Sequence, residues 1–352
     1  MNKRKVEINM GRSTVYNNIT TEELVAQILP ENQTLSTDFL EYLRSIDRSP
    51  TTIEQYKSDL KIFFVYNLQF NNNKRFTEIT KREFARFQNH AINEWQWSPK
   101  RTRRVKSVLS SLSNYIECIL DEEPEYENYR STIKKIESPV NQPVLEKSVF
   151  TEEEIQSLLD WLVDNKKYRQ ACCVALAAAS GRRKSEIPRF KVSYFNEENI
   201  LFGSLYKTNE KVKTKGRGSR GKEIHLYVLK KQFDPYLKLW MDYRKENGIE
   251  SEWLFPNMND YSLPMTINTM NEWAKTYSKF LGKDFYWHSL RHYFTTLLVK
   301  NNIPTNVIQD IVNWESADMV NLYTDISADE NIGKYFDENG IKQVETKSFS
   351  DL

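Results

Sequence analysis

Residues 171–179 constrain the fold of this chain more than any other segment, because every one of their side chains is apolar. The run is ACCVALAAA, with no polar residue in it. A helix that is apolar on nearly every side is stable only when it is buried. The segment before it begins with Thr151 and Glu154, the capping-box pair of a helix that carries Ile155 and Leu158 at helical spacing. We therefore expect a helical core in this part of the chain, with residues 171–179 inside it.

The N-terminal part also shows helical spacing of its apolar residues. Residues 1–33 are polar and irregular apart from a short helical pattern that we expect to end at Pro30, and we interpret them as an N-terminal arm. Residues 34–135 predict an all-helical domain. Its helices are expected to begin at residues of types that favour helix starts, namely Ser36, Thr51, Thr80 and Ser98.

A linker separates this helical domain from the rest of the chain. Residues 136–149 hold two prolines, few large apolar residues and no periodicity. We expect a second domain over residues 150–326 and a C-terminal segment over residues 327–352. Residues 192–229 are richer in β-forming residues and glycine, which predicts a small sheet around a basic turn. The expected fold class is mainly α with a small β-sheet, an all-helical domain followed by an α+β domain.

Composition limits the class of protein. A chain of 352 residues, 39% of them hydrophobic, is long enough for two cores. No apolar run approaches the ~18 residues of a membrane span, and the start of the chain lacks a signal peptide. We expect a soluble, cytoplasmic protein with no membrane partner. The three cysteines, Cys118, Cys172 and Cys173, fit neither a disulfide framework nor a zinc site, and we interpret them as core residues.

Positive charge is clustered rather than abundant. Fifty Lys and Arg against 48 Asp and Glu give a net charge of +2, which by itself does not indicate a nucleic-acid partner. The first cluster consists of Arg101, Arg103, Arg104 and Lys106. The second consists of Lys211, Lys213, Lys215, Arg217, Arg220 and Lys222. Either cluster is suited to contact phosphates, and a solvated surface is the alternative interpretation.

An arginine pair follows the apolar run. Arg182 and Arg183 come directly after Gly181, and Glu186 stands three residues beyond Arg183. A basic helix end capped by glycine would explain the pair without any function. Arg183 is the stronger candidate of the two, because only that choice places Glu186 one helical turn away, where its carboxylate can orient the guanidinium.

Two later segments carry further candidates. His288 and Arg291 stand three residues apart and share one helix face. His288 and His292 are spaced like a metal-binding pair, but the glutamate of the H-E-x-x-H motif is absent, so we expect no metal and no cofactor. Trp314 and Tyr323 are nine residues apart, and each alone would be an ordinary packing residue.

Taken in order, these residues resemble the active site of the tyrosine recombinases, the family of phage integrases and Xer-type resolvases. The six corresponding positions are Arg183, Lys215, His288, Arg291, Trp314 and Tyr323. Residues 49–63 are similar to the opening helices of the family's core-binding domain, so the resemblance extends from about residue 36 to residue 323. Three features depart from the family pattern. Val312-Asn313 replaces a leucine-glycine pair, Arg182 fills a normally apolar position, and the turn holding Lys215 is longer than usual, which makes Lys213 a competitor for its role.

The resemblance implies a role for each residue. Tyr323 would attack a DNA phosphodiester and form a phosphotyrosine link, with His288 accepting its proton and Lys215 protonating the leaving 5′ oxygen. Both arginines and the Trp314 indole would stabilise the negative phosphate. DNA-backbone contacts are expected from Arg101, Arg103, Arg104, Lys106, Lys213, Arg217 and Arg220.

The resemblance also implies partners and leaves alternatives open. The expected partner is double-stranded DNA held by a homo-oligomer, a tetramer in the family, with residues 332–341 as the segment that docks on a neighbouring protomer or back on its own domain. Integration or excision of a mobile element is the preferred function. The alternatives are Xer-type dimer resolution, a catalytically silent DNA-binding regulator, and a type IB topoisomerase or telomere resolvase.

Overall fold

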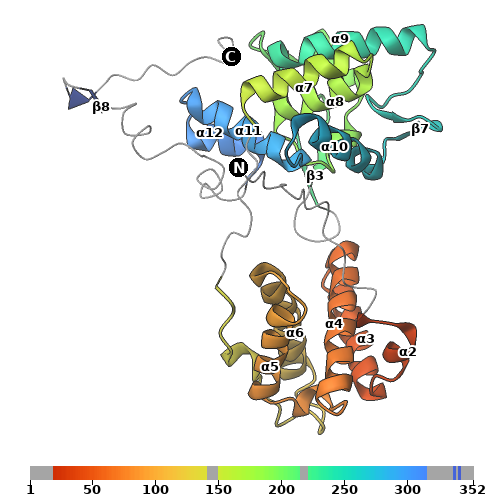
Figure 1. The fold of residues 1–352 in the computed structure, drawn as a ribbon, viewed down its shortest axis with the longest axis vertical. Helices are drawn as coiled ribbons and strands as arrows, with labels where there is room; N and C mark the ends of the chain where they lie inside the picture. Colours follow the sequence, from red (N-terminus) through yellow and green to blue (C-terminus); the bar gives the residue numbers. More distant parts are fainter. Residues whose placement is uncertain (1–18, 141–149, 215–220, 315–335, 338–339, 342–352) are drawn as a thin grey trace, which may run out of the picture. The chain divides into compact units, whose positions relative to one another are not determined.

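The computed structural model describes residues 19–140, 150–214, 221–314, 336–337 and 340–341 (Figure 1). The chain divides into two compact units, with a division between Leu145 and Glu146. The first unit contains the described residues up to 140, and the second contains those from 150 onward. Each unit has its own hydrophobic core, as expected for a chain of this length.

The described part of the first unit is helical. Its elements are α2 (Glu22–Ala26), α3 (Pro30–Ser45), α4 (Pro50–Phe70), the 3-10 helix η1 (Phe76–Glu78), α5 (Lys81–Asn93), α6 (Pro99–Ile119) and the 3-10 helix η2 (Ile133–Lys135). The side chains of Ser49, Thr80 and Ser98 cap the first turns of α4, α5 and α6 by accepting hydrogen bonds from backbone N–H groups. The all-helical prediction is therefore confirmed for this unit.

The predicted start of the first long helix was wrong. We expected a helical pattern to end at Pro30 and a helix to begin at Ser36, but Pro30 is the first residue of α3 and the preceding helix already ends at Ala26. Proline lacks only an N–H group that is unpaired in a first helical turn, so it begins helices as readily as it follows them. The expected boundary at residue 33 consequently falls inside α3.

Aromatic packing holds the first unit together. The ring of Phe63 on α4 is buried, and its centroid lies 5.4 Å from that of Phe84 and 5.1 Å from that of Phe87, both on α5. Phe76 in η1 contacts the same ring from another side. Edge-to-face and stacked pairs of this kind fix α4, α5 and η1 relative to one another.

The second unit is built around α8. Its helices are α7 (Glu152–Asp164), α8 (Tyr168–Ser180), α9 (Lys230–Glu246), α10 (Ile267–Leu281), α11 (Trp287–Lys300) and α12 (Thr305–Val312), with 3-10 turns η3 (Ile187–Arg189), η4 (Val192–Phe195) and η5 (Glu197–Asn199). Helix α8 contacts α7, α9 and α11, and residues 171–180 are all buried (Figure 1). The prediction of a buried helix is confirmed.

Short antiparallel strands complete the second unit. A three-stranded sheet has the order β1 (Ile200–Leu201), β2 (Leu205–Lys207), β5 (Tyr227–Leu229), and a hairpin pairs β3 (Val212–Thr214) with β4 (Lys222–Ile224). These strands confirm the small sheet expected around a basic turn. Two further pairs, β6 (Pro256–Asn257) with β7 (Asp260–Pro264) and β8 (Phe336–Asp337) with β9 (Gly340–Ile341), lie in segments where we expected no strand.

Two other expectations concern cysteine and the membrane. Cys172 and Cys173 are buried as predicted, but Cys118 is exposed near the end of α6, so our interpretation of it as a core residue was wrong. Within the described ranges, no helix combines the length and the apolar character needed to cross a membrane.

Candidate active site

Arg183 is held by a buried carboxylate. Helix α8 ends at Ser180 and is capped by Gly181, whose left-handed backbone (φ 59°) turns the chain out of the helix. The following turn is closed by a 2.8 Å hydrogen bond from the Glu186 N–H to the Arg183 carbonyl oxygen. Glu186 is fully buried, and its carboxylate accepts 3.1 Å hydrogen bonds from the backbone N–H and from Nη1 of Arg183. The pair expected one helical turn apart thus meets in a tight turn, and the Arg183 side chain remains partly exposed.

Arg291 joins the ends of two other helices. It lies on α11 and is buried, and its Nη1 donates a 2.9 Å hydrogen bond to the carbonyl oxygen of Gly181. Its Nη2 donates a 3.0 Å hydrogen bond to the carbonyl oxygen of Val312 at the end of α12. The guanidinium carbon also lies 5.1 Å from the centroid of the Trp314 ring. Arg291 therefore connects the arginine turn after α8 with the segment that leads to Trp314.

His288 lies one turn before Arg291 on α11. Partial desolvation, together with the positive charges of Arg291 and Arg183, lowers the pKa of His288 below its ordinary value. The imidazole is therefore neutral at physiological pH, which is the form that can accept a proton. His292 packs its ring edge-on against His288 at 5.3 Å. No group of three or more potential metal-ligating side chains occurs in the part of the chain that the structure covers.

Trp314 follows a helix end that requires an unusual backbone conformation. Asn313 adopts left-handed angles (φ 57°, ψ 65°), and the Trp314 N–H donates a 3.0 Å hydrogen bond back to the Gln309 carbonyl oxygen. Asparagine tolerates these angles better than other residues with a side chain. This tolerance explains how Asn313 can stand where the family pattern has the glycine of its leucine-glycine pair. The Asn313 side-chain oxygen accepts a 2.9 Å hydrogen bond from Lys222 Nζ on β4. This contact ties the basic hairpin to the Trp314 segment.

The structure locates only part of the basic hairpin. Lys213 is exposed on β3 and pairs in register with Glu223 on β4. A Cβ atom on Gly221 would lie 2.5 Å from the Thr214 carbonyl oxygen, so the hairpin leaves no space for a side chain there. Lys215, Arg217 and Arg220 lie outside the described residues, as does Tyr323. Their predicted roles stay predictions.

The basic cluster on α6 is less free than its sequence suggested. Arg104 donates a 2.8 Å hydrogen bond to Asp59 on α4, and Arg101 lies 3.8 Å from the same carboxylate and stacks on Trp97. Desolvation raises the pKa of Asp59, and it lowers the pKa of Arg101 to about 10. Both arginines are therefore oriented by a buried acid that our sequence analysis missed. The available signal was a carboxylate on the apolar face of a helix, between Tyr56 and Phe63.

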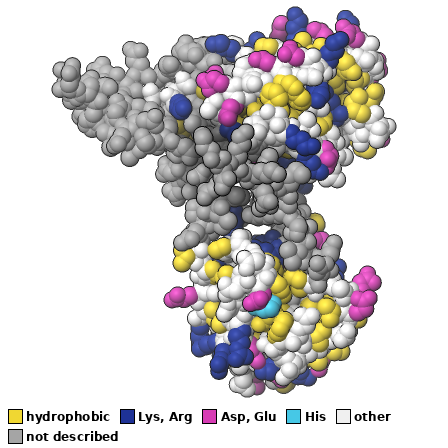
Figure 2. Space-filling model, viewed as in Figure 1, with side chains coloured by type: hydrophobic (Ala, Val, Ile, Leu, Met, Phe, Trp, Pro, Cys, Tyr) yellow, Lys and Arg dark blue, Asp and Glu magenta, His cyan; other side chains and the backbone are white. Residues whose placement is uncertain are grey.

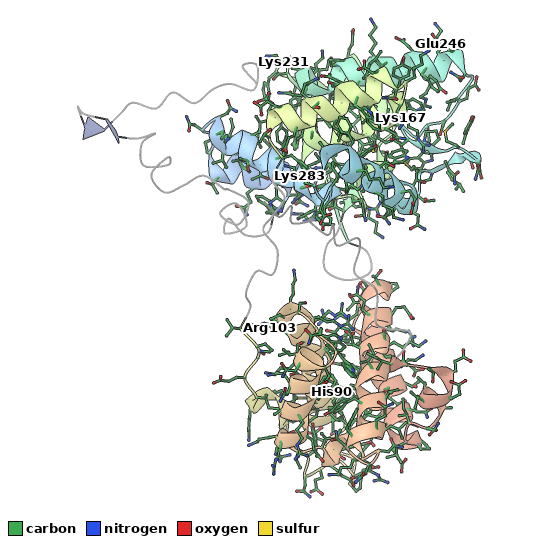
Figure 3. The ribbon with its side chains drawn as sticks, in the orientation of Figure 1. His90, Arg103, Lys167, Lys231, Glu246 and Lys283 are labelled. Atoms are coloured by element: carbon green, nitrogen blue, oxygen red, sulfur yellow. The ribbon has the colours of Figure 1, made fainter. Side chains whose placement is uncertain are left out.

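The other two residues of this cluster contact the chain beyond η2. Arg103, labelled in Figure 3, donates a 2.9 Å hydrogen bond to the Pro139 carbonyl oxygen. Lys106 donates a 3.0 Å hydrogen bond to the Ser138 hydroxyl. Lys and Arg side chains gather in patches on the surface of both units (Figure 2). The α6 cluster is thus a partly fixed set of charges rather than a fully solvated run.

The two units correspond to two known domain models. Residues 148–330 match the phage integrase family, and residues 35–123 match the phage integrase N-terminal SAM-like domain. The chain is similar to the SPbeta prophage-derived recombinase-like protein YomM of Bacillus subtilis, with 29% identity over 254 residues, which cover 72% of this chain and 73% of that protein.

Solved structures share the fold. One is the XerH site-specific recombinase bound to palindromic difH substrate, with a TM-score of 0.61, 20% identity, and coverage of 88% of this chain and 86% of that chain. Another is a lambda integrase tetramer bound to a Holliday junction, with a TM-score of 0.61, 15% identity, and coverage of 83% and 77%. At these identities the likeness concerns the fold alone.

The family match covers more than half of the chain, and the chain therefore belongs to the phage integrase family. It is a tyrosine recombinase, an enzyme that cleaves and joins DNA strands in site-specific recombination. The mainly α fold with small sheets, predicted from the sequence, agrees with this membership.

Proposed function

We propose that this enzyme recombines DNA through a covalent 3′-phosphotyrosyl intermediate on Tyr323 and that it integrates or excises a mobile element. The observation that carries the proposal is the convergence of Arg183, His288, Arg291 and Trp314 on the adjoining ends of α8 and α12. These are four of the six residues that the family resemblance assigns to catalysis, and they come from three separate segments of the chain.

Electrostatics explains why such a site needs no metal. A phosphodiester repels an incoming nucleophile, and further negative charge builds on its oxygens in the transition state. Arg183 offers forked donors from a partly exposed position, and Glu186 fixes its orientation without covering it. Arg291 supplies a second guanidinium, and the Trp314 indole N–H supplies a donor that does not titrate.

Proton transfers are assigned to two further residues. A tyrosine hydroxyl has a reference pKa of about 10, so Tyr323 must lose its proton during attack, and a neutral His288 is the proposed acceptor. Lys215, followed by Gly216 in the sequence between β3 and β4, is the proposed donor to the leaving 5′ oxygen. The resulting ester keeps the energy of the broken linkage, so a 5′ hydroxyl of another strand reverses the reaction without ATP.

DNA binding is assigned to the charged residues of both units. Arg101, Arg103, Arg104 and Lys106 on α6, with Lys213, Arg217 and Arg220 of the hairpin, are proposed to contact phosphates. Such contacts position the duplex without specifying its sequence. A tetramer is proposed for the active assembly, in line with the lambda integrase tetramer of the same fold, and residues 332–341 are proposed to dock between protomers. Phe336 and Ile341 of that segment are paired in the β8–β9 register, while Ile332 and Tyr335 lie outside the described residues.

The mobile-element role is supported by the prophage origin named for the Bacillus subtilis relative. Dimer resolution of the Xer type is the alternative within the family. The domain limits proposed for the chain are those expected from its sequence, except that the limit at residue 33 cuts α3 and is moved to the start of that helix at Pro30. The expected limits were an arm over residues 1–33, a DNA-binding domain over residues 34–135, a linker over residues 136–149, a catalytic domain over residues 150–326 and a tail over residues 327–352.

The proposal is tested by trapping the covalent intermediate. A binding site is first selected from random-sequence duplexes, and a nick is then placed beside each scanned phosphate so that cleavage releases a short strand and cannot be reversed. Wild-type protein is expected to form a denaturation-resistant protein–DNA adduct at one phosphate, and Tyr323→Phe is expected to form none. An adduct that persists in Tyr323→Phe overturns the assignment of the nucleophile.

Other outcomes favour other functions. Failure of the wild type to form an adduct on a site that it binds tightly would indicate a DNA-binding regulator. Adduct formation without strand exchange between two sites, but with relaxation of supercoils, would indicate a topoisomerase. Recombination between the ends of an element and a target supports the mobile-element role.

A further inference from the structure

Arg182, which the catalytic assignments leave without a role, is one of the largest fully buried side chains among the described residues. Its position in the arginine turn is normally apolar in the family that the sequence resembles. Burial lowers the pKa of Arg182 to about 10, and the Glu186 carboxylate counteracts part of this effect, so the side chain stays charged at neutral pH. A buried charge costs more than an apolar side chain of similar volume, which calls for a compensating contact.

That contact is a bridge between two helix ends. Arg182 Nε donates a 3.1 Å hydrogen bond to the carbonyl oxygen of Ser180, the last residue of α8. Its Nη2 donates a hydrogen bond to the carbonyl oxygen of Ile311, in the last turn of α12. Its Nη1 has no acceptor among the residues that the structure describes. The guanidinium thus connects the end of α8 to a backbone carbonyl that lies 129 positions after Arg182 in the sequence.

Arg291 makes a parallel bridge one residue further along both helices. Its acceptors are the carbonyl oxygens of Gly181 and Val312, which directly follow Ser180 and Ile311, the acceptors of Arg182. The two guanidinium groups therefore link the same pair of helix ends, α8 and α12, through four hydrogen bonds to two pairs of consecutive carbonyl oxygens. Both side chains are buried and oriented by backbone carbonyls, and of the two only Arg291 stands at a position that the family resemblance assigns to contact with the DNA phosphate.

We propose that Arg182 is a positioning residue that keeps the ends of α8 and α12 together while Arg291 engages the scissile phosphate. Without Arg182, Arg291 alone would hold the two helix ends together. The DNA phosphate and the Val312 carbonyl oxygen would then compete for the same Arg291 donors. Arg183 is attached to one of the two linked ends and Trp314 to the other, and the segment leading to Tyr323 continues from the second. The inference rests on the proposed function, since it assigns Arg182 to the cleavage step.

The test compares three variants of the full-length protein. Arg182→Met removes the bridge and keeps much of the volume, and Arg182→Lys keeps the charge but only part of the hydrogen bonding. The matched control is Arg244→Met, because Arg244 is also buried and donates to the carbonyl oxygens of Ser251, Trp253 and Leu254, away from the α8–α12 junction. Folded fraction is followed for all variants by thermal unfolding.

The first measurement is the single-turnover rate of adduct formation on the nicked site at saturating protein. Misplacement of catalytic groups by about 1 Å typically costs ~100-fold in rate, so Arg182→Met is expected to slow cleavage by ~100-fold with unchanged DNA affinity, and Arg182→Lys to recover part of that loss. Arg244→Met is expected to cleave at the wild-type rate per folded molecule. Equal rates for Arg182→Met and wild type, or equal losses in Arg182→Met and Arg244→Met, overturn the proposal.

The second measurement does not depend on catalysis. Amide hydrogen exchange in residues 305–314 is expected to accelerate in both Arg182 variants and to stay unchanged in Arg244→Met, because the Ile311 carbonyl loses its link to α8. Unchanged exchange in Arg182→Met overturns the bridge, even if that variant folds too poorly for kinetics. A wild type that forms no adduct would instead overturn the proposed function, which separates the two failures.

Discussion

His288 is the residue whose proton affinity the site controls most directly. Desolvation lowers its pKa, and the charges of Arg291 and Arg183 lower it further. A general base works only when unprotonated, so the rate of adduct formation should be at its plateau at pH 7 and fall about tenfold per unit once the pH drops below the pKa of His288. We expect the midpoint of this acid limb to lie below about 6.5, the ordinary histidine value.

The same prediction can be checked without catalysis. The chain has only four histidines, so the His288 ring can be followed individually by NMR. Arg183→Gln removes one of the charges that lower the His288 pKa and should raise it toward, but not to, the ordinary value, because desolvation and Arg291 persist. A titration midpoint for His288 above the ordinary value in the wild type would contradict the electrostatic account.

Single substitutions can decide whether Lys215 or Lys213 protonates the leaving 5′ oxygen. If Lys215 protonates the leaving 5′ oxygen, Lys215→Ala should slow cleavage by ~100-fold or more, since a general acid typically contributes that much. Replacing the 5′ bridging oxygen with sulfur gives a leaving group that departs without a proton, and Lys215→Ala should cleave this substrate at nearly the wild-type rate. Lys213→Ala serves as the control. Rescue of Lys213→Ala rather than Lys215→Ala would assign the role to Lys213.

Helix ends are the elements that organise this site. Helix α12 is capped by Asn313 in the left-handed region, and we expect Asn313→Ala to reduce the free energy of unfolding of the second unit by about 1 kcal/mol, because alanine lacks the short polar side chain that lets asparagine tolerate these angles. Asn313→Gly should be nearly neutral. Both variants lose the hydrogen bond from Lys222, so their difference isolates the backbone strain. Denaturant unfolding measures both, and equal losses would contradict this explanation of Asn313.

The same elements show what sequence can and cannot predict. Buried α8 and the pairing of Arg183 with Glu186 follow from local pattern, because composition and three-residue spacing are visible in one segment. The role of Arg182 was not visible, because its acceptors are backbone carbonyls and one of them belongs to a helix far along the chain. Asp59 was missed for a similar reason, since its partners lie on α6. The β6–β7 hairpin was missed because its polar strands lack alternation of apolar and polar residues.

Assembly is the property of the whole molecule that the proposed function most depends on. In complete recombination four strands are cut, each by the tyrosine of a different protomer in the proposed tetramer, whereas a single cleavage needs only one active tyrosine. Mixing wild type with Tyr323→Phe therefore separates the two events. In a randomly mixed equimolar tetramer population, cleavage should fall to about one half and recombination to about one sixteenth of the wild-type level.

Cleavage and recombination are distinguished by how steeply each declines with the fraction of Tyr323→Phe, and not by their absolute rates. Titrating the fraction of Tyr323→Phe should give a linear decline of adduct formation and a fourth-power decline of recombinant product between two plasmid sites. Mixing with Arg244→Met, whose catalytic residues are intact, controls for the effect of mixing itself. A linear decline of both products would mean that one active tyrosine is enough for recombination, which would contradict the requirement for four active protomers. A fourth-power decline requires that four protomers act within one complex, and it would tie the site at the ends of α8 and α12 to strand exchange.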